Sequence, residues 1–119
     1  MFRFAIRPHK SFRPEAAAKF GIACSQPLIV APVSGPAPSK PRFELSSDKV
    51  VVTAFKPSND GKGWIVRLFG ASGKTEKVKL AWASTAPQVW LSDTSEKPRD
   101  KAGPSVEVPG WGIVTLRAE

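Results

Sequence analysis

The fold class of this chain is decided by residues 50–69, which read VVVTAFKPSNDGKGWIVRLF. β-Branched and aromatic residues dominate residues 50–55 and 64–69, and residues of these types favour extended strands. Between them, residues 58–63 read SNDGKG, and Asn, Asp and Gly readily adopt the left-handed backbone conformations of tight turns. The stretch therefore predicts a β-hairpin.

Further short stretches with the character of strands follow or precede this hairpin. In one of them, residues 75–82, apolar residues occupy alternate positions, which is the period of a strand with one buried face. Short strands separated by turn signals every 8 to 12 residues or so are typical of antiparallel sandwiches. We therefore predict an all-β fold, an antiparallel β-sandwich of the immunoglobulin-like type, with one short N-terminal helix. The remaining predicted strands are residues 43–45, 89–91, 105–108 and 112–117.

The N-terminal residues have a different character. In residues 2–7, large apolar side chains alternate with Arg and Ala, which predicts a strand. Residues 14–20 begin with proline and predict a short helix, which we expect to stop before Pro27. Residues 28–31, Leu-Ile-Val-Ala, predict another short strand.

These patterns divide the chain into three parts. Residues 1–31 are a strand-helix-strand segment, residues 32–41 are a proline-rich connector, and residues 42–119 are the sandwich domain. A segment as short as the first cannot bury enough surface to fold alone. We expect it to pack on the sandwich or on another part of a larger assembly.

Composition excludes several classes of protein. The chain has 119 residues and a net charge of +8, with basic residues spread singly, so we expect a solvated or partner-facing surface. One Cys and one His exclude an internal disulfide, a multi-cysteine metal site and a two-histidine zinc site. No signal peptide or membrane-spanning run is expected, because no apolar stretch has the necessary length. A free-standing protein of this kind would be cytoplasmic.

Four local motifs suggest chemistry but have simpler structural interpretations. Residues 70–75, GASGKT, lack the first glycine of a phosphate loop and predict a turn. Asp93 and Glu96 have a spacing that suits turn hydrogen bonds better than a glycosidase carboxylate pair. We expect His9 to be a structural or surface residue, because no acid or nucleophile lies near it in sequence. Cys24 is expected to be a buried, inert thiol.

The four tryptophans are possible platforms for sugar rings, which stack on exposed aromatic faces. Trp64 and Trp82 lie on apolar faces of predicted strands and are expected in the core. Trp90 and Trp111 are the weak candidates for carbohydrate binding. Burial against neighbouring structure remains the favoured expectation for both.

Several further stretches of the sequence are informative when they are taken together. They are FRFAIRPHK (2–10) with Phe12-Arg13, Gln26-Pro27-Leu28, residues 50–56 with Asp60-Gly61 and residues 65–69, LSDTSE (91–96), and Pro109 with residues 112–117. Together they resemble the C-terminal region of glycoside hydrolase family 38 α-mannosidases. The resemblance covers nearly the whole chain in the same order, and in that family residues 1–31 correspond to the end of the preceding central β-domain. Departures are Gly70, where the family often has Asn or Glu, and the proline-rich connector.

The resemblance implies a domain without catalytic or metal-binding residues. Family members are retaining α-mannosidases whose Asp nucleophile and zinc ion belong to an N-terminal catalytic domain, and no position here matches that motif. We therefore expect no catalytic activity from this chain alone, no cofactor in it, and a structural or substrate-cleft-shaping role.

The expected partners follow from the same resemblance. They are the remainder of a mannosidase polypeptide, or a second copy bound through an exposed strand edge. One alternative is a free-standing carbohydrate-binding module that takes an α-mannoside. A second is a basic nucleic-acid-binding module, which is disfavoured because Lys and Arg do not cluster beside the candidate tryptophans. We expect no membrane partner.

Overall fold

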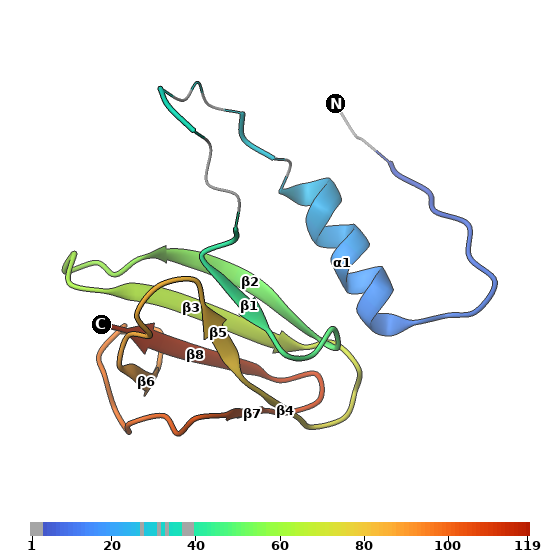
Figure 1. Ribbon diagram of the computed structural model, residues 1–119. Helices are drawn as coiled ribbons and strands as arrows, with labels where there is room; N and C mark the ends of the chain where they lie inside the picture. The colour runs from blue at the N-terminus through green and yellow to red at the C-terminus, as the bar shows by residue number, and fades with distance from the viewer. Residues whose placement is uncertain (1–3, 27, 31, 33, 37–39) are drawn as a thin grey trace.

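The computed structural model describes residues 4–26, 28–30, 32, 34–36 and 40–119. This part of the chain forms one helix followed by strands, most of them short (Figure 1). In chain order the elements are α1 (Pro14–Ser25), β1 (Phe43–Leu45), β2 (Val50–Pro57), β3 (Trp64–Gly70), β4 (Glu76–Val78), β5 (Leu80–Trp82), β6 (Val89–Ser92), β7 (Val106–Val108) and β8 (Ile113–Ala118).

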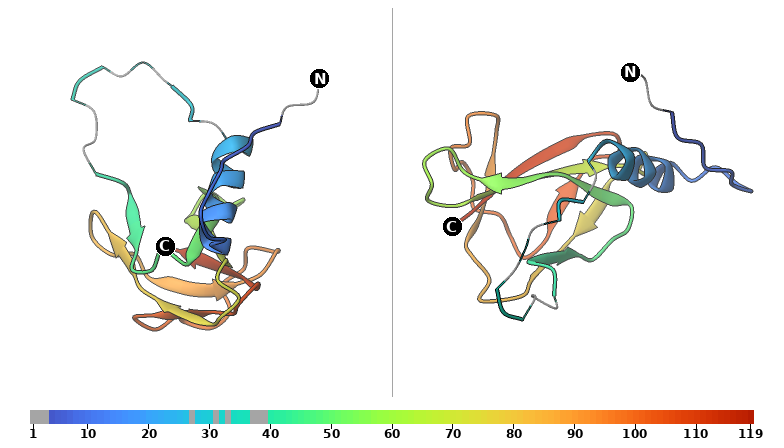
Figure 2. Two further views of the ribbon diagram at one scale, coloured as in Figure 1. Left: turned by 90° about the vertical axis from the view of Figure 1, so that its right-hand side faces the viewer. Right: turned by 90° about the horizontal axis from the view of Figure 1, so that it is seen from above.

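The strands form two layers, so the prediction of an antiparallel β-sandwich is confirmed. One layer is a four-stranded sheet in the order β2-β3-β8-β6, in which every pairing is antiparallel. The other layer consists of two antiparallel pairs, β1 with β5 and β4 with β7. Figures 1 and 2 show these pairs lying across one face of the four-stranded sheet.

The predicted hairpin is present and joins β2 to β3. Its register pairs Val50 with Gly70 at one end and Pro57 with Trp64 at the other, with a bulge between Val52 and Ala54. Gly61, at φ +71°, supplies the left-handed position that the connecting turn needs.

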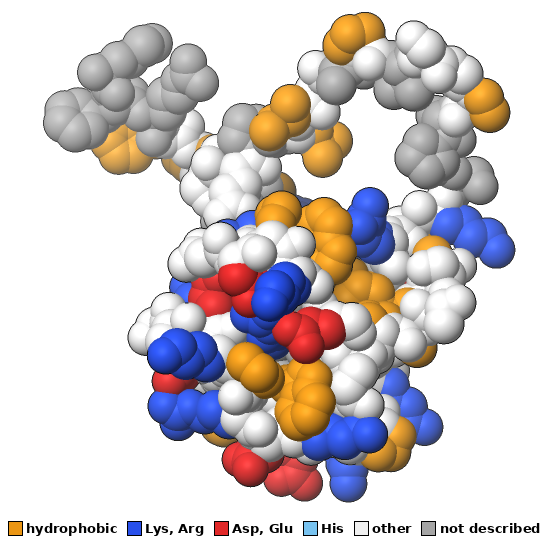
Figure 3. Space-filling view, turned by 90° about the vertical axis from the view of Figure 1, so that its left-hand side faces the viewer, with side chains coloured by type: hydrophobic (Ala, Val, Ile, Leu, Met, Phe, Trp, Pro, Cys, Tyr) orange, Lys and Arg blue, Asp and Glu red, His pale blue; other side chains and the backbone are white. Residues whose placement is uncertain are grey.

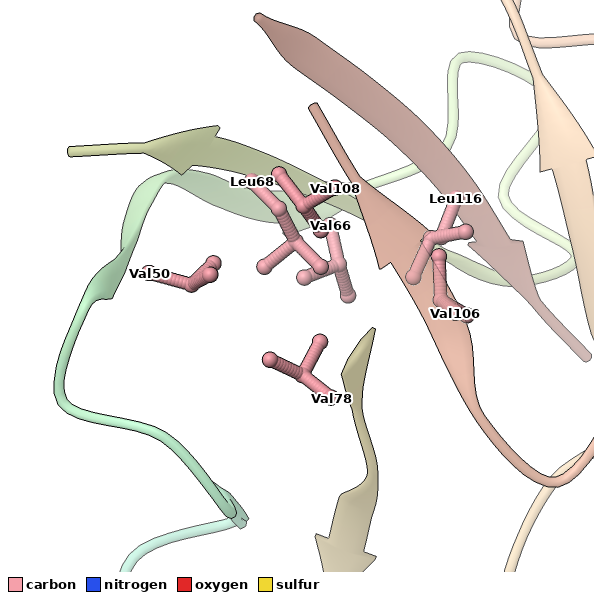
Figure 4. Close-up of a cluster of buried hydrophobic side chains, with 7 residues drawn as sticks. All are labelled: Val50, Val66, Leu68, Val78, Val106, Val108 and Leu116. Carbon is pink, nitrogen blue, oxygen red and sulfur yellow. The ribbon is translucent and has the colours of Figure 1, made fainter. Parts of the chain in front are cut away.

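The core lies between the two layers. Val66, Leu68, Val78, Val108 and Leu116 have no exposed surface, and they come from β3, β4, β7 and β8. Figure 4 shows these side chains pointing toward one another from the facing strands. The core is therefore a contact between layers, and neither layer could bury its apolar face without the other.

Residues 75–82 form two strands instead of the single strand that their pattern predicts. The break falls at Lys79, whose backbone nitrogen donates a hydrogen bond to Ser46 Oγ at 2.9 Å. The predicted alternation is nevertheless correct, because Val78 is buried and Leu80 and Trp82 are half-buried. The strand is therefore interrupted between β4 and β5, while its apolar side stays toward the core.

The helix is confirmed, but the two strands predicted on either side of it are wrong wherever they fall within the described residues. Residues 4–7 and 28–30 belong to no strand, and their side chains are exposed. Residues 2, 3 and 31 of these two predicted strands lie outside the described residues. A strand needs a neighbour to satisfy its backbone hydrogen bonds, and none of the described strands pairs with these segments.

Helix α1 contacts β2 without being buried by it. None of its residues is fully buried, and its start is held by Arg13, which lies 2.6 Å from Glu15 and 3.4 Å from Asp48. Figure 2 shows the helix beside the sandwich, outside both layers. The contact between α1 and β2 is small, because the apolar residues of the helix are at most partly buried and much of its surface stays in water.

We expect that Leu68→Ala destabilises the domain by about 2–5 kcal/mol, because the truncation leaves a cavity between the layers. The control is Ile113→Thr at a β8 side chain that is 63% exposed, where a surface change of this type alters stability by no more than about 0.5 kcal/mol. Urea unfolding followed by tryptophan fluorescence measures both. Equal losses in the two variants would contradict the two-layer core.

Candidate functional site

Trp111 is exposed, so the expectation that it is buried is wrong. It is 59% exposed and has a backbone φ of +59°, a conformation that bulky residues rarely adopt. The Pro109–Gly112 turn imposes this conformation: Trp111 N donates to Gly70 O at 2.8 Å, and Gly112 N donates to Pro109 O at 3.0 Å. One side of the indole lies against Gly73. Its ring centroid lies 6.3 Å from that of Phe69 in a tilted arrangement.

Trp90 is half-buried and does not join Trp111 in one site. It pairs with Arg117 across β6 and β8, and Lys101 forms a bridge with it on the other edge. Trp111 precedes β8 at the opposite end. At a rise of ~3.3 Å per strand residue, six residues separate the two ends by roughly 20 Å. The two sequence candidates therefore cannot form one aromatic platform.

Trp64 and Trp82 are only half-buried, and they belong to a row of aromatic rings that runs from β5 through β1 and β2 to β3. The rings follow one another: Trp82 lies 5.1 Å from Phe43, Phe43 lies 5.2 Å from Phe55, and Phe55 stacks on Trp64 at 4.9 Å. Trp82 packs against the core as predicted. Trp64 ends the row and carries the guanidinium of Arg42 on its ring, 4.4 Å from the centroid.

A cleft of about 750 Å³ opens beside this row, and we name it the Trp64–Trp82 cleft. Basic side chains lie along it together with proline and hydroxyl residues. Figure 3, which views the end with the β2–β3 loop and the C-terminal residues, shows hydrophobic groups set among basic and acidic side chains. The described residues that matter for its chemistry are Lys40, Arg42, Pro57, Lys62, Trp64, Trp82, Ser84, Thr85, Pro87 and Glu119.

Sequence reasoning missed this cleft. Its aromatic members were visible as tryptophans, but they were assigned to the core. The nearest signal was the Arg42-Phe43 pair that opens β1, because a basic residue beside an aromatic one is common in binding sites. Only the pairing of Phe43 with Trp82 brings the two halves of the cleft together.

A second polar cluster lies on the outer face of the four-stranded sheet, and we name it the Arg117 network. Arg117 is 5% exposed and donates to Asp60 at 2.7 Å, to Glu119 at 2.7 Å and to the backbone oxygen of Glu96 at 2.8 Å. Glu96 is also buried. Its carboxylate accepts hydrogen bonds from Lys56 and, at 2.7 Å, from the backbone nitrogen of Asn59.

The carboxylates of this network are held in their charged form. The Lys56 ammonium, followed by the Asn59 backbone amide, lowers the pKa of Glu96. Hydrogen bonds from the Ser58 hydroxyl and from Arg117 hold the pKa of Asp60 well below its usual range. A carboxylate with a lowered pKa is a poor proton donor near neutral pH. The network therefore suits the fixing of loops, not acid catalysis.

The network encloses one apolar residue of the outer face. Ile65 pairs with Lys56 on one side and Arg117 on the other, and it is 1% exposed. The loop that contains Glu96 closes over this position. It does so with Glu96 at φ +62°, a backbone conformation that its hydrogen bonds hold in place.

The turn interpretation is confirmed for Asp93, whereas the carboxylate of Glu96 bonds to Lys56 and Asn59 of the β2–β3 hairpin instead of to its own turn. Asp93 Oδ1 accepts hydrogen bonds from the backbone nitrogen of Ser95 at 2.7 Å and from its hydroxyl, and Asp93 also forms an ion pair with Arg99. The Ser95 hydroxyl and backbone nitrogen lower the pKa of Asp93. Both carboxylates are thus occupied by neighbours within the fold.

The other motifs have structural or surface roles in the described residues. Residues 70–75 run from the end of β3 through a turn toward β4, as predicted. His9 is exposed, with Nδ1 3.0 Å from Ser11 O. Cys24 is exposed, so its predicted burial is wrong; α1 buries none of its residues. Among residues with described positions, no three His, Cys, Asp or Glu side chains gather as metal ligands, and no helix is long and apolar enough to span a membrane.

The chain matches a known protein family. The family described as glycosyl hydrolases family 38 C-terminal beta sandwich domain matches residues 49–116, which is more than half of the chain. No curated protein and no solved structure matches the chain. The matched residues begin just before β2 and end in β8, so they contain the hairpin and nearly all of the core.

We expect Glu96→Gln to lower the urea midpoint at about pH 7, because the neutral amide leaves Lys56 without its buried partner. The folded-state pKa of Glu96 is lowered, so its contribution is complete above the unfolded-state pKa of about 4.3 and disappears as the pH falls through the folded value. The gap between wild type and variant should therefore close on acidification.

The matched control is Glu44→Gln at an exposed glutamate in β1, which should follow the wild type throughout. Urea unfolding between about pH 7 and pH 3 measures all three proteins. A Glu96→Gln variant with the wild-type midpoint at neutral pH would contradict a stabilising role for the network.

Proposed function

Because this chain belongs to the glycosyl hydrolase family 38 C-terminal β-sandwich domain family, we propose that it is a non-catalytic domain of an α-mannosidase-like glycoside hydrolase. Its role is to pack against the remainder of that polypeptide and to shape the surroundings of the substrate cleft. The sandwich supplies a rigid body, and the N-terminal residues supply the contact.

The observation that carries this proposal is the exposure of apolar residues before the sandwich. Phe4 and Ile6 are 91% and 93% exposed, and Leu28, Ile29 and Val30 are 94–97% exposed. Large apolar side chains left in water in two short segments are typical of surfaces that a partner covers. Their sequences favour strands, and strands would form where a sheet of the remaining polypeptide offers an edge. The proposed division at residues 32–41 separates this contact segment from the sandwich.

The non-catalytic part of the proposal is supported by the state of the carboxylates. Asp60, Asp93 and Glu96 each accept several hydrogen bonds from within the fold. The zinc ion of the resembled enzymes does not fit the residues described here, because the single histidine, His9, lies in an exposed segment against the backbone of Ser11. We propose that any zinc belongs to another domain of the polypeptide.

We expect the isolated chain to self-associate in light scattering, because the exposed segment lacks its partner and pairs with a second copy. The double variant Leu28→Asp/Val30→Asp should be monomeric with an unchanged urea midpoint. A control, Gln26→Asp/Ser34→Asp, places the same charges at exposed polar positions of the same region and should associate like the wild type. A monomeric wild type whose first 31 residues are removed readily by protease would contradict the proposal.

A second candidate function is binding of an α-mannoside at Trp111. The observation that favours it is the conformation of this residue: a ring 59% exposed on a backbone at φ +59°. Backbone strain of this kind costs on the order of 1–3 kcal/mol and is concentrated at ligand sites. Trp90 is a poorer platform because it is half-buried between Arg117 and Lys101.

For this candidate we expect tryptophan fluorescence to change during titration with mannobiose in the millimolar range. Trp111→Ala should abolish the change, because the stacking face is lost. Trp90→Phe should retain it. An unchanged spectrum of the wild type with mannobiose would contradict sugar binding at this residue.

A further inference from the structure

The Trp64–Trp82 cleft has an excess of positive charge. Lys40, Arg42 and Lys62 line it, and the ion pairs of the described residues involve none of the three. Glu119 is the acidic lining residue, and its carboxylate is already bound by Arg117 at 2.6 Å. An anion that enters the cleft therefore meets cations whose charge the fold has not neutralised.

Arg42 is oriented for recognition of such an anion. Its guanidinium lies over the Trp64 ring, with Cζ 4.4 Å from the centroid, and a cation–π contact of this type is worth about 0.5–1 kcal/mol at an exposed site. None of the ion pairs of the described residues uses Arg42, so the N–H donors at the planar edge of its guanidinium are available to a ligand. That planar edge matches the paired oxygens of a phosphate or carboxylate.

The size of the cleft and its uncharged lining residues indicate which kind of molecule bears the anionic group. A volume of about 750 Å³ falls within the range of roughly 300–1,000 Å³ found for small-molecule sites. Ser84 and Thr85 contribute hydroxyl groups, and Pro57 and Pro87 contribute apolar surface. A hydroxylated ring satisfies both kinds of group, because its edge forms hydrogen bonds and its C–H face packs on apolar walls.

The aromatic rings argue against a nucleic acid strand as the ligand. Single strands bind by stacking successive bases on free ring faces. Here Phe55 stacks on Trp64 with an interplanar angle of 21°, Arg42 also covers that ring, and Phe43 lies 5.1 Å from Trp82. The rings pack against one another and against Arg42, so they offer few free faces for bases. We therefore expect the basic side chains of the cleft, and not the rings, to recognise a ligand.

We propose that the Trp64–Trp82 cleft binds a monosaccharide that carries a phosphate or carboxylate group, with Arg42 as the residue that pairs with the anion. This site is separate from Trp111 and from the apolar N-terminal segment. The proposal therefore goes beyond the packing role and does not depend on it.

The test is isothermal titration of the full chain with four probes: mannose 6-phosphate, glucuronic acid, mannose and inorganic phosphate. We expect at least one of the two anionic sugars to bind about tenfold or more tightly than both mannose and inorganic phosphate. Arg42→Gln should weaken that binding at least about tenfold, and Arg42→Lys should recover part of it because the charge remains. Lys77→Gln, which removes one exposed charge in β4 away from the cleft, is the matched control.

The four probes and the variants separate the outcomes. Preference for the phosphate or the uronate identifies the anion, and either preference supports the site. Equal binding of mannose, equal binding of inorganic phosphate, no binding of either anionic sugar, or full binding by Arg42→Gln would each overturn the proposal. A short oligothymidylate is titrated as an additional competitor, and tighter binding of it than of either anionic sugar would overturn the proposal in favour of a nucleic acid site. The oligomeric state of Arg42→Gln should match the wild type. A negative titration would therefore overturn the ligand site alone, and the packing role is tested separately by light scattering.

Discussion

The burial of the inner face of β3 is the constraint on which the rest of the sandwich depends. β3 pairs with β2 on one side and β8 on the other, so it has no free edge, and Val66 and Leu68 on its inner face have no exposed surface. That face is shielded from water only if a second layer covers it. Val78 of β4 and Val108 of β7 provide this cover. Because the covering strands are three residues each, they owe their stability to this contact more than to their own pairing.

On the opposite face of β3, charged side chains cover the apolar residue Ile65. Ile65 is as well buried as the inner residues, but what surrounds it is the Arg117 network, in which every carboxylate has a partner. Buried charges are tolerated when they are paired and hydrogen-bonded, and the described residues leave no buried side-chain polar atom unsatisfied. The loops at this end of the sandwich are thereby fixed, which gives the neighbouring surface a defined shape.

One loop connects these two environments. The β2–β3 turn contributes Asp60 to the Arg117 network and Lys62 to the Trp64–Trp82 cleft. Glu119 likewise lines the cleft while its carboxylate belongs to the network. Charges are paired on the network side and unpaired on the cleft side. This asymmetry supports the proposed ligand site in the cleft, whereas the exposed apolar residues before β1 support the proposed contact with a protein partner.

The sequence by itself determined the elements whose signals are local. The hairpin at residues 50–69, helix α1 and the turn at Asp93 follow from residue types a few positions apart, so strand propensity, a proline at the first helical turn and hydrogen bonds within a turn predict them. Tertiary structure decided everything that needs a distant partner. It exposed Trp111 and Cys24, left residues 4–7 and 28–30 without strand neighbours, and placed Arg42 on Trp64 through the pairing of β1 with β5. The physical reason is that burial and pairing depend on which surfaces meet, and this is set by packing across residues far apart in the chain.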